Sequence, residues 1–160
     1  MVSALRMCDF EDSQFTQIMN DCLKDFLNVK ELRVEQRTFL INLAHGKDVF
    51  AILPTSFGKS LIFQLFPRVV SALHSIKAAK LLSTIIMVSP LVSVMRDQVG
   101  QLKRFGFSAA AIGIGKECKE DEEKVRNGEC KIVFGSPESW LSKAWMKELK
   151  EGKLGRRGPQ

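Results

Sequence analysis

An uncharged apolar run at residues 49–53 (Val-Phe-Ala-Ile-Leu) is followed by the tripeptide Gly58-Lys59-Ser60 and then by a segment with helical spacing. This order predicts a buried strand, a tight loop and a helix N-terminus. Unpaired backbone N–H groups and the helix dipole favour an anion at such a corner. The feature therefore predicts an α/β fold with a phosphate site. A surface turn with one exposed lysine is the alternative, and the preceding apolar run argues against it.

The same corner indicates which kind of phosphate it suits. Lys59 would reach the β- and γ-phosphates of a nucleoside triphosphate, and the Ser60 hydroxyl would hold Mg²⁺. The general pattern has glycine five residues before Gly58, and Leu53 stands there instead.

Composition limits the classes of protein to consider. The 160 residues suffice for one domain, and 24 basic against 18 acidic residues give a net charge of +6, which favours a polyanionic partner. The four cysteines form no Cys-x-x-Cys pair, so we expect no zinc site and reduced thiols in the cytosol or nucleus. No secretory or membrane-spanning apolar run is present, so we expect an intracellular protein without a membrane partner.

Hydrophobic periodicity predicts an alternating series of elements. Strands are expected at 49–53, 84–88, 109–112 and 131–134. Helices are expected at about 12–27 (capped by Asp12 or Ser13), 33–44, 59–67 (ended or kinked by Pro67), 91–105, 117–127 and 138–150. The strand at 84–88 carries no charge and is expected to be buried on both faces. The last helix is expected to carry its apolar residues on one side: Trp140, Leu141, Ala144, Trp145 and Leu149. The alternation predicts a parallel sheet with helices on both faces.

Three further segments can each be interpreted in two ways, as part of a binding site or as ordinary structure. The amide of Gln36 could pair with the edge of adenine, or Gln36 is a plain surface residue. Residues 89–98 follow a strand at the sheet edge where ligands bind, and could hold a nucleic-acid phosphate, or Ser89 caps a helix. The segment Ser136-Pro137-Glu138 is a favourable helix start, which explains it without function.

Together these segments resemble the first RecA-like domain of RecQ-family DNA helicases over about residues 26–154. The resemblance is carried by Arg-x-x-Gln at 33–36, Leu-Pro-Thr-Ser-Phe-Gly-Lys-Ser-Leu at 53–61, Ser-Pro-Glu at 136–138 and, most specifically, the block at 88–99. It implies a P-loop NTPase fold and ATP hydrolysis, with Mg²⁺, coupled to 3′-to-5′ movement on single-stranded or forked DNA. A nuclear role in DNA repair and recombination is implied as well.

The resemblance also assigns roles to residues. Gln36 would recognise adenine with Arg33 nearby, Lys59 would act in catalysis by pairing with the phosphates, and Ser60 would ligate Mg²⁺. The phosphates would be wrapped by Thr55, Ser56, Phe57, Gly58, Lys59 and Ser60. The DNA would be contacted by Ser89, Pro90, Ser93, Arg96, Gln98, Ser136 and Glu138.

The chain departs from the family pattern at two points. Ser56 stands where the family usually has glycine, and serine would be strained there if the position needs φ > 0. The family's Asp-Glu-x-His segment occurs nowhere in the sequence, and it supplies the Mg²⁺ anchor and the group that orients water. We therefore expect an α/β RecA-like sheet truncated before that strand, with no ATPase activity in this chain alone.

The expected organisation is an amphipathic helix region at 1–28, a partial helicase ATP-binding domain at 29–150 and a disordered basic tail at 151–160. Two alternatives stay open. A non-catalytic product could bind DNA or a protein partner without ATP turnover. A small P-loop kinase or GTPase would leave the block at 88–99 unexplained, and the guanine-reading Asn-Lys-x-Asp pattern is absent.

Overall fold

The computed structural model describes residues 11–26, 29–76, 84–115 and 119–151. The chain divides into two compact units, Met1–Lys80 (unit 1) and Leu81–Gln160 (unit 2). Most of the tail predicted at 151–160 lies outside the described residues, as do Cys8 and Cys118.

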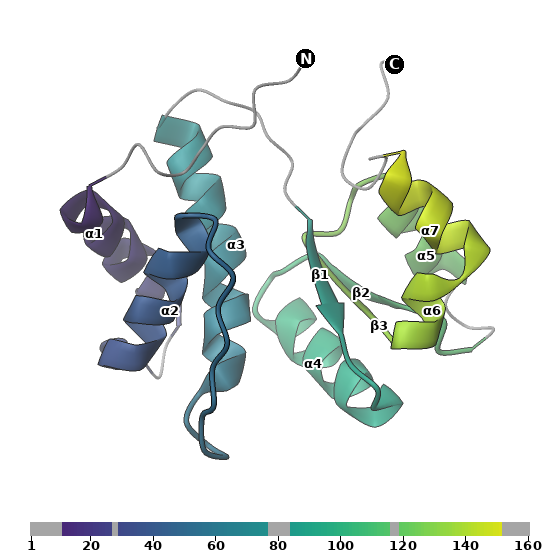
Figure 1. The fold of residues 1–160 in the computed structure, drawn as a ribbon, viewed down its shortest axis with the longest axis horizontal. Coiled ribbons are helices and arrows are strands. Elements are labelled where there is room, and N and C mark those ends of the chain that lie inside the picture. Colours follow the sequence, from purple (N-terminus) through teal and green to yellow (C-terminus); the bar gives the residue numbers. More distant parts are fainter. Residues whose placement is uncertain (1–10, 27–28, 77–83, 116–118, 152–160) are drawn as a thin grey trace. The chain divides into compact units, whose positions relative to one another are not determined.

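Unit 1 is a cluster of three helices, α1 (Asp12–Leu23), α2 (Val34–Ala44) and α3 (Lys59–Ile76). Both α1 and α2 pack against α3 (Figure 1). The fully buried side chains of the three helices include Met19, Leu40, Leu65, Val69 and Leu73. The three helices predicted for this unit are confirmed, but the predicted cap of α1 is wrong. Asp12 is itself the first helical residue, and Glu11 precedes it without a side-chain capping bond.

Helix α3 continues through Pro67 to Ile76. The prediction that Pro67 ends the helix is therefore wrong, and the alternative of a kink there stays a prediction. Proline has no N–H to donate to the carbonyl one turn earlier, which costs roughly 3 kcal/mol in a helix interior. Apolar burial on both sides of Pro67 offsets this cost, because Leu65, Val69 and Leu73 are all at most 1% exposed. Packing therefore outweighs the local helix-breaking tendency.

The predicted strand at 49–53 is absent, and these residues belong to the irregular loop between α2 and α3 (Figure 1). Phe50 is 90% exposed and Ile52 is 85% exposed. A strand needs a neighbour to pair its backbone N–H and C=O groups, and the described part of unit 1 contains no strand. The apolar run therefore leads to the phosphate loop without forming a strand.

Unit 2 contains a three-stranded parallel sheet built from β1 (Ile85–Val88), β2 (Ala109–Ile112) and β3 (Ile132–Gly135). The strand order is β1-β3-β2. Val88 of β1 and Ile112 of β2 both pair with Gly135 of β3, so all three strands end at the same level. The three strands predicted for this half of the chain and their parallel pairing are confirmed.

Helices cover both faces of this sheet (Figure 1). Helix α4 (Val92–Arg104) packs on one face through its buried residues Met95, Val99 and Leu102. Helices α5 (Lys119–Arg126), α6 (Pro137–Leu141) and α7 (Lys143–Lys150) lie on the other face. The core on that face consists of Ala110, Ile112, Val125, Cys130, Val133, Trp140 and Trp145. This layered α/β arrangement is consistent with a RecA-like fold.

Strand β1 is an edge strand, and the expectation that it is buried on both faces is wrong. Ile86 is 40% exposed and Val88 is 59% exposed, whereas β2 and β3 are buried along their whole length. Strand β2 is also an edge strand, but α4 and α5 pack against it. Cover by helices therefore decides the burial of these strands, and the uncharged composition of β1 does not reveal it.

The predicted final helix is two helices separated at Ser142. Ser142 has extended backbone, and its hydroxyl accepts a hydrogen bond from the Trp145 N–H, which caps α7. The change in direction leaves Leu141 71% exposed, while Trp140 and Trp145 pack edge to face with ring centroids 5.8 Å apart. The single apolar side predicted for this helix is therefore wrong at Leu141, and Ala144 is exposed as well.

Burial raises the pKa of the Cys22 and Cys130 thiols, which keeps them protonated at neutral pH. Both are free cysteines. Among the described helices, none combines the length and the apolar character needed to cross a bilayer.

Candidate functional site

The phosphate loop lies between the apolar run at 49–53 and the first turn of α3. Ser56 and Gly58 both have positive φ, +68° and +86°, and the Phe57 N–H donates to the Pro54 carbonyl at 3.3 Å. These two residues turn the chain directly into the helix at Lys59. The first N–H groups of a helix have no acceptor within the helix, so the loop presents them at an exposed surface. This geometry suits a phosphate group.

Ser56 is the single described non-glycine residue with positive φ. Serine was expected to be strained at this position if the turn needs positive φ. The turn does place residue 56 in the left-handed region. A residue with a side chain pays roughly 1–2 kcal/mol to adopt it. The loop is therefore formed but strained at Ser56.

The Lys59 side chain is directed toward the loop that precedes it. Its ammonium donates hydrogen bonds to the carbonyl oxygens of Leu53 at 3.0 Å and Pro54 at 2.8 Å. An ammonium has three donors, so one remains for a further acceptor. Ser60 is half-buried beside it in the first turn of α3.

Gln36 fixes the loop from the side of α2. Its Nε2 donates to the carbonyls of Phe57 at 3.2 Å and Gly58 at 3.1 Å, and its Oε1 accepts from the Arg33 N–H at 3.0 Å. Gln36 is 3% exposed, so the interpretation as a plain surface residue is wrong. Gly58 allows the close approach, because a Cβ there would lie 2.7 Å from Nε2.

Arg33 completes this group. Its guanidinium carbon lies 4.5 Å from the centroid of the Phe57 ring, a cation–π contact. The structure thus brings together Arg33, Gln36, Phe57 and Gly58, with Lys59 next in the chain. Sequence reasoning placed Arg33 near Gln36, and it gave no role to the Phe57 ring.

In unit 2 the predicted DNA-contacting residues begin at the carboxyl edge of the sheet. Ser89 follows β1 and Ser136 follows β3, and the Ser89 N–H donates to the Gly135 carbonyl at 3.1 Å. The Ser89 hydroxyl accepts from the Leu91 N–H at 3.4 Å. It therefore closes a turn before α4 and does not cap the helix directly. Pro90 and Ser93 are exposed beside it.

Arg96 and Gln98 lie on α4 in different environments. Arg96 is exposed, and its Nη2 donates to the Ile114 carbonyl at 3.2 Å, which ties α4 to the loop after β2. Gln98 is half-buried, and its Oε1 has no hydrogen-bond partner in the part of the chain that the structure describes. Arg96 is thus the accessible cation of this segment.

Ser136 caps α6, as its sequence context predicts. Its hydroxyl accepts from the Ser139 N–H at 3.2 Å and lies 3.0 Å from the Ser139 hydroxyl. Hydrogen bonding from Ser136, together with a backbone hydrogen bond, lowers the pKa of the exposed Glu138 carboxyl below its usual 4.5. Glu138 is therefore ionised at neutral pH and can only accept hydrogen bonds.

The sequence analysis did not identify two residues at this edge of the sheet, Gly113 and Ser139. Gly113 directly follows β2, and a side chain there would collide with the Ser139 Cβ at 2.8 Å. Gly113 could have been found from the sequence. It directly follows the predicted strand at 109–112, just as Ser89 and Ser136 follow the strands before them. Ser139 could be found only from the packing of α6 against that loop.

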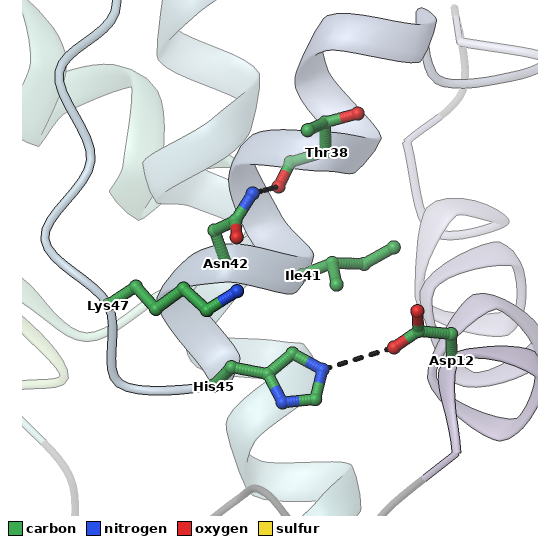
Figure 2. Close-up of a pocket in the computed structure, with 6 residues that line it drawn as sticks. All are labelled: Asp12, Thr38, Ile41, Asn42, His45 and Lys47. Carbon is green, nitrogen blue, oxygen red and sulfur yellow. Dashed lines mark hydrogen bonds and ion pairs between the residues drawn. The ribbon is translucent and has the colours of Figure 1, made fainter.

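A separate pocket of about 500 Å³ in unit 1 contains none of the predicted site residues (Figure 2). It is lined by Asp12, Thr38, Ile41, Asn42, His45 and Lys47. Within it, His45 Nε2 lies 3.1 Å from Asp12 Oδ1, and Asn42 donates to the Thr38 carbonyl at 2.8 Å. No cluster of three or more potential metal ligands (His, Cys, Asp or Glu) occurs in the described ranges.

The sequence model of the DEAD/DEAH box helicase family matches residues 33–154. The chain is 30% identical over 135 residues to the "ATP-dependent DNA helicase Q-like SIM" of Arabidopsis thaliana, which covers 84% of this chain and 14% of that protein.

Two further relatives carry related names. The "ATP-dependent helicase SGS1" of Saccharomyces cerevisiae is 38% identical over 96 residues, 58% of this chain and 6% of that protein. The "ATP-dependent DNA helicase RecQ" of Haemophilus influenzae is 24% identical over 135 residues, 82% of this chain and 20% of that protein. The chain thus spans at most about a fifth of the length of these three relatives, and the resemblance to RecQ-family helicases is confirmed.

Proposed function

Because this chain belongs to the DEAD/DEAH box helicase family, we propose that it binds Mg-ATP at the phosphate loop of unit 1 and DNA at the carboxyl edge of the sheet in unit 2. The observation that carries the proposal is the turn from Ser56 to Gly58, which presents the first N–H groups of α3. The family's use of ATP agrees with this geometry.

The residues of the loop fit a triphosphate. Thr55, Ser56, Gly58 and Lys59 are exposed, so the described residues of unit 1 leave this loop open to solvent. Lys59 would turn from the two loop carbonyls to the β- and γ-phosphates, where a charge-assisted hydrogen bond is stronger than a neutral one. Ser60, in the first turn, would offer its hydroxyl to Mg²⁺, which when bound neutralises phosphate charge.

We assign the base end of the nucleotide to Gln36 and Arg33. The Gln36 amide has both a donor and an acceptor, as the edge of adenine requires. Both of its N–H donors now bind loop carbonyls. Adenine needs one of these donors, so it would replace one of the two carbonyls and leave the other bound to Gln36. Binding of the base would thus change the hydrogen bonds of the phosphate loop.

DNA would be held at the sheet edge by Ser89, Pro90, Ser93, Arg96, Gln98, Ser136 and Glu138. Serine hydroxyls and the Arg96 guanidinium suit phosphate oxygens. The ionised Glu138 repels phosphate, so it would accept hydrogen bonds from bases or sugars. Movement from 3′ to 5′ on single-stranded or forked DNA, in the nucleus, is the activity that we propose for the RecQ-like helicase to which these sites belong.

The experiment is calorimetric titration of the full chain with Mg-ATP. We expect saturable binding, and we expect Lys59→Ala to weaken it about ten- to a hundredfold, since a hydrogen bond to a charged group contributes about 1.5–3 kcal/mol. The matched control is Lys47→Ala, which removes an exposed lysine outside the loop and should leave affinity unchanged. If the unmutated chain releases no heat and no nucleotide raises its melting temperature, the nucleotide site is refuted.

A second candidate is DNA binding without ATP turnover. The observation in its favour is that the Lys59 ammonium is engaged by two loop carbonyls. DNA-stimulated phosphate release that Lys59→Ala abolishes would support an ATPase. Salt-sensitive DNA binding with no phosphate release would support the second candidate.

A further inference from the structure

Phe57 contacts both residues that we assign to the base end of the nucleotide. Its ring lies under the Arg33 guanidinium, 4.5 Å from ring centroid to Cζ. Its carbonyl oxygen accepts from Gln36 Nε2 at 3.2 Å. A single residue of the phosphate loop is therefore joined to the base site through its side chain and through its backbone.

Among the residues that the structure describes, the Phe57 ring is the group recorded in contact with the Arg33 guanidinium. Arg33 is exposed and precedes α2 with extended backbone, and its N–H is the group bound by Gln36. A long flexible side chain at such a position samples many rotamers. A planar guanidinium stacks well on an aromatic face, so the Phe57 ring selects one orientation of Arg33.

The loop conformation places the ring there. Phe57 lies between Ser56 and Gly58, the two residues with positive φ, and its N–H donates to the Pro54 carbonyl. The ring position thus depends on the turn that presents the N–H groups to phosphate. Unfolding of the turn would release Arg33 and Gln36 together.

We propose that Phe57 is a positioning residue for the nucleobase: its ring orients Arg33 and its carbonyl holds Gln36, so that the base site is assembled only on a folded phosphate loop. This inference rests on the proposed nucleotide site. It assigns to the Phe57 side chain a role in binding the base, whereas the loop backbone binds phosphate.

The test compares Mg-ATP with Mg-tripolyphosphate, which lacks the base and ribose, by calorimetry. Phe57→Leu keeps an apolar side chain without a π face. We expect it to weaken ATP binding about two- to fivefold, the size of an exposed cation–π contact, with tripolyphosphate affinity unchanged. Phe57→Tyr should restore ATP affinity. Arg33→Ala should match Phe57→Leu, and the double variant should be no weaker than Arg33→Ala alone.

Equal losses for ATP and tripolyphosphate would overturn the inference and reduce Phe57 to a structural residue of the loop. Additive losses in the double variant would overturn it as well, because residues that act through one contact are coupled. In both cases ATP binding by the unmutated chain would leave the proposed nucleotide site standing.

A second measurement does not depend on nucleotide. The NMR signal of the Arg33 Nε–H group should be displaced by the ring current of Phe57 in the unmutated chain and in Phe57→Tyr, and it should return to an ordinary position in Phe57→Leu. An Arg33 signal that Phe57→Leu does not move would show that the ring does not orient the guanidinium, whatever the chain binds.

Discussion

At the scale of single residues, the conformation of the phosphate loop depends on Ser56. The turn requires positive φ there, and serine meets the requirement at a cost in backbone energy. The neighbouring carbonyls of Phe57 and Gly58 are held by Gln36, which stabilises the strained turn. A local strain is thus offset by hydrogen bonds from a residue of α2.

We predict that Ser56→Gly stabilises the chain by about 1 kcal/mol, because glycine adopts positive φ without steric cost. Mg-ATP affinity should rise or stay equal, because a larger fraction of molecules would hold the loop in the conformation that presents its N–H groups. Urea unfolding and calorimetry measure the two effects. Thr55→Gly is the control: Thr55 has no positive φ, and glycine there should destabilise the chain through backbone entropy. The interpretation of strain at Ser56 fails if both variants destabilise equally.

At the scale of elements, the carboxyl end of β3 is covered by α6 because Gly135 has no side chain. A Cβ at Gly135 would lie 2.5 Å from Trp140 Nε1 and 2.8 Å from Ile112 Cγ1. The Trp140 indole also donates to the Met87 carbonyl of β1 at 3.4 Å. One indole thus joins α6 to two strands at the edge where the proposed DNA contacts lie.

Gly135→Ala should therefore destabilise the chain by about 1–3 kcal/mol, the usual cost of forcing extra volume into a packed core. Gly100→Ala provides the comparison, because Gly100 lies in α4 with no atom within 4 Å of its would-be Cβ. Alanine should stabilise the helix there by up to about 1 kcal/mol. Urea unfolding of both variants gives the sign of the change in the free energy of unfolding. If Gly135→Ala leaves this free energy unchanged, the Trp140 indole can move aside without cost.

At the scale of the whole molecule, the excess of positive charge agrees with a polyanionic partner. The net charge is +6, and Arg96 is the exposed arginine in the first half of α4, next to the carboxyl edge of the sheet. Arg104 is also exposed, in the last turn of the same helix. The net charge alone predicts binding to any polyanion. The position of Arg96 predicts where a polyanion would bind, at the carboxyl edge of the sheet.

We expect the affinity for single-stranded DNA to fall with salt, with a slope of about −0.7 in log K against log salt for each phosphate neutralised. Arg96→Ala should reduce the magnitude of this slope by about 0.7. Arg104→Ala removes the same charge at the other end of α4 and should leave the slope nearly unchanged. Fluorescence anisotropy over a range of salt measures both. Equal effects of the two variants would indicate non-specific attraction, and the sheet-edge site would be refuted.

Much of the fold followed from local patterns. The helices α2, α4 and α5 and the strands β2 and β3 depend on spacing and capping rules that act within a few residues. Strain at Ser56 was expected from the family resemblance, on the condition that the position needs positive φ. The parallel pairing followed from the alternation of strands and helices. The phosphate loop and the serines after β1 and β3 were predicted from the sequence alone, because they directly follow or precede elements with clear local patterns.

Tertiary structure decided the features that depend on distant partners. The apolar run at 49–53 is not a strand because no strand pairs with it in the described part of unit 1. Both β1 and β2 are edge strands, and β2 is the buried one because α4 and α5 pack against it. Gln36 is buried because its amide meets loop carbonyls about twenty residues further along the chain. The Arg33–Phe57 contact has the same origin. Pairing and burial are properties of surfaces brought together by folding, whereas turns and helix ends are properties of the chain next to them.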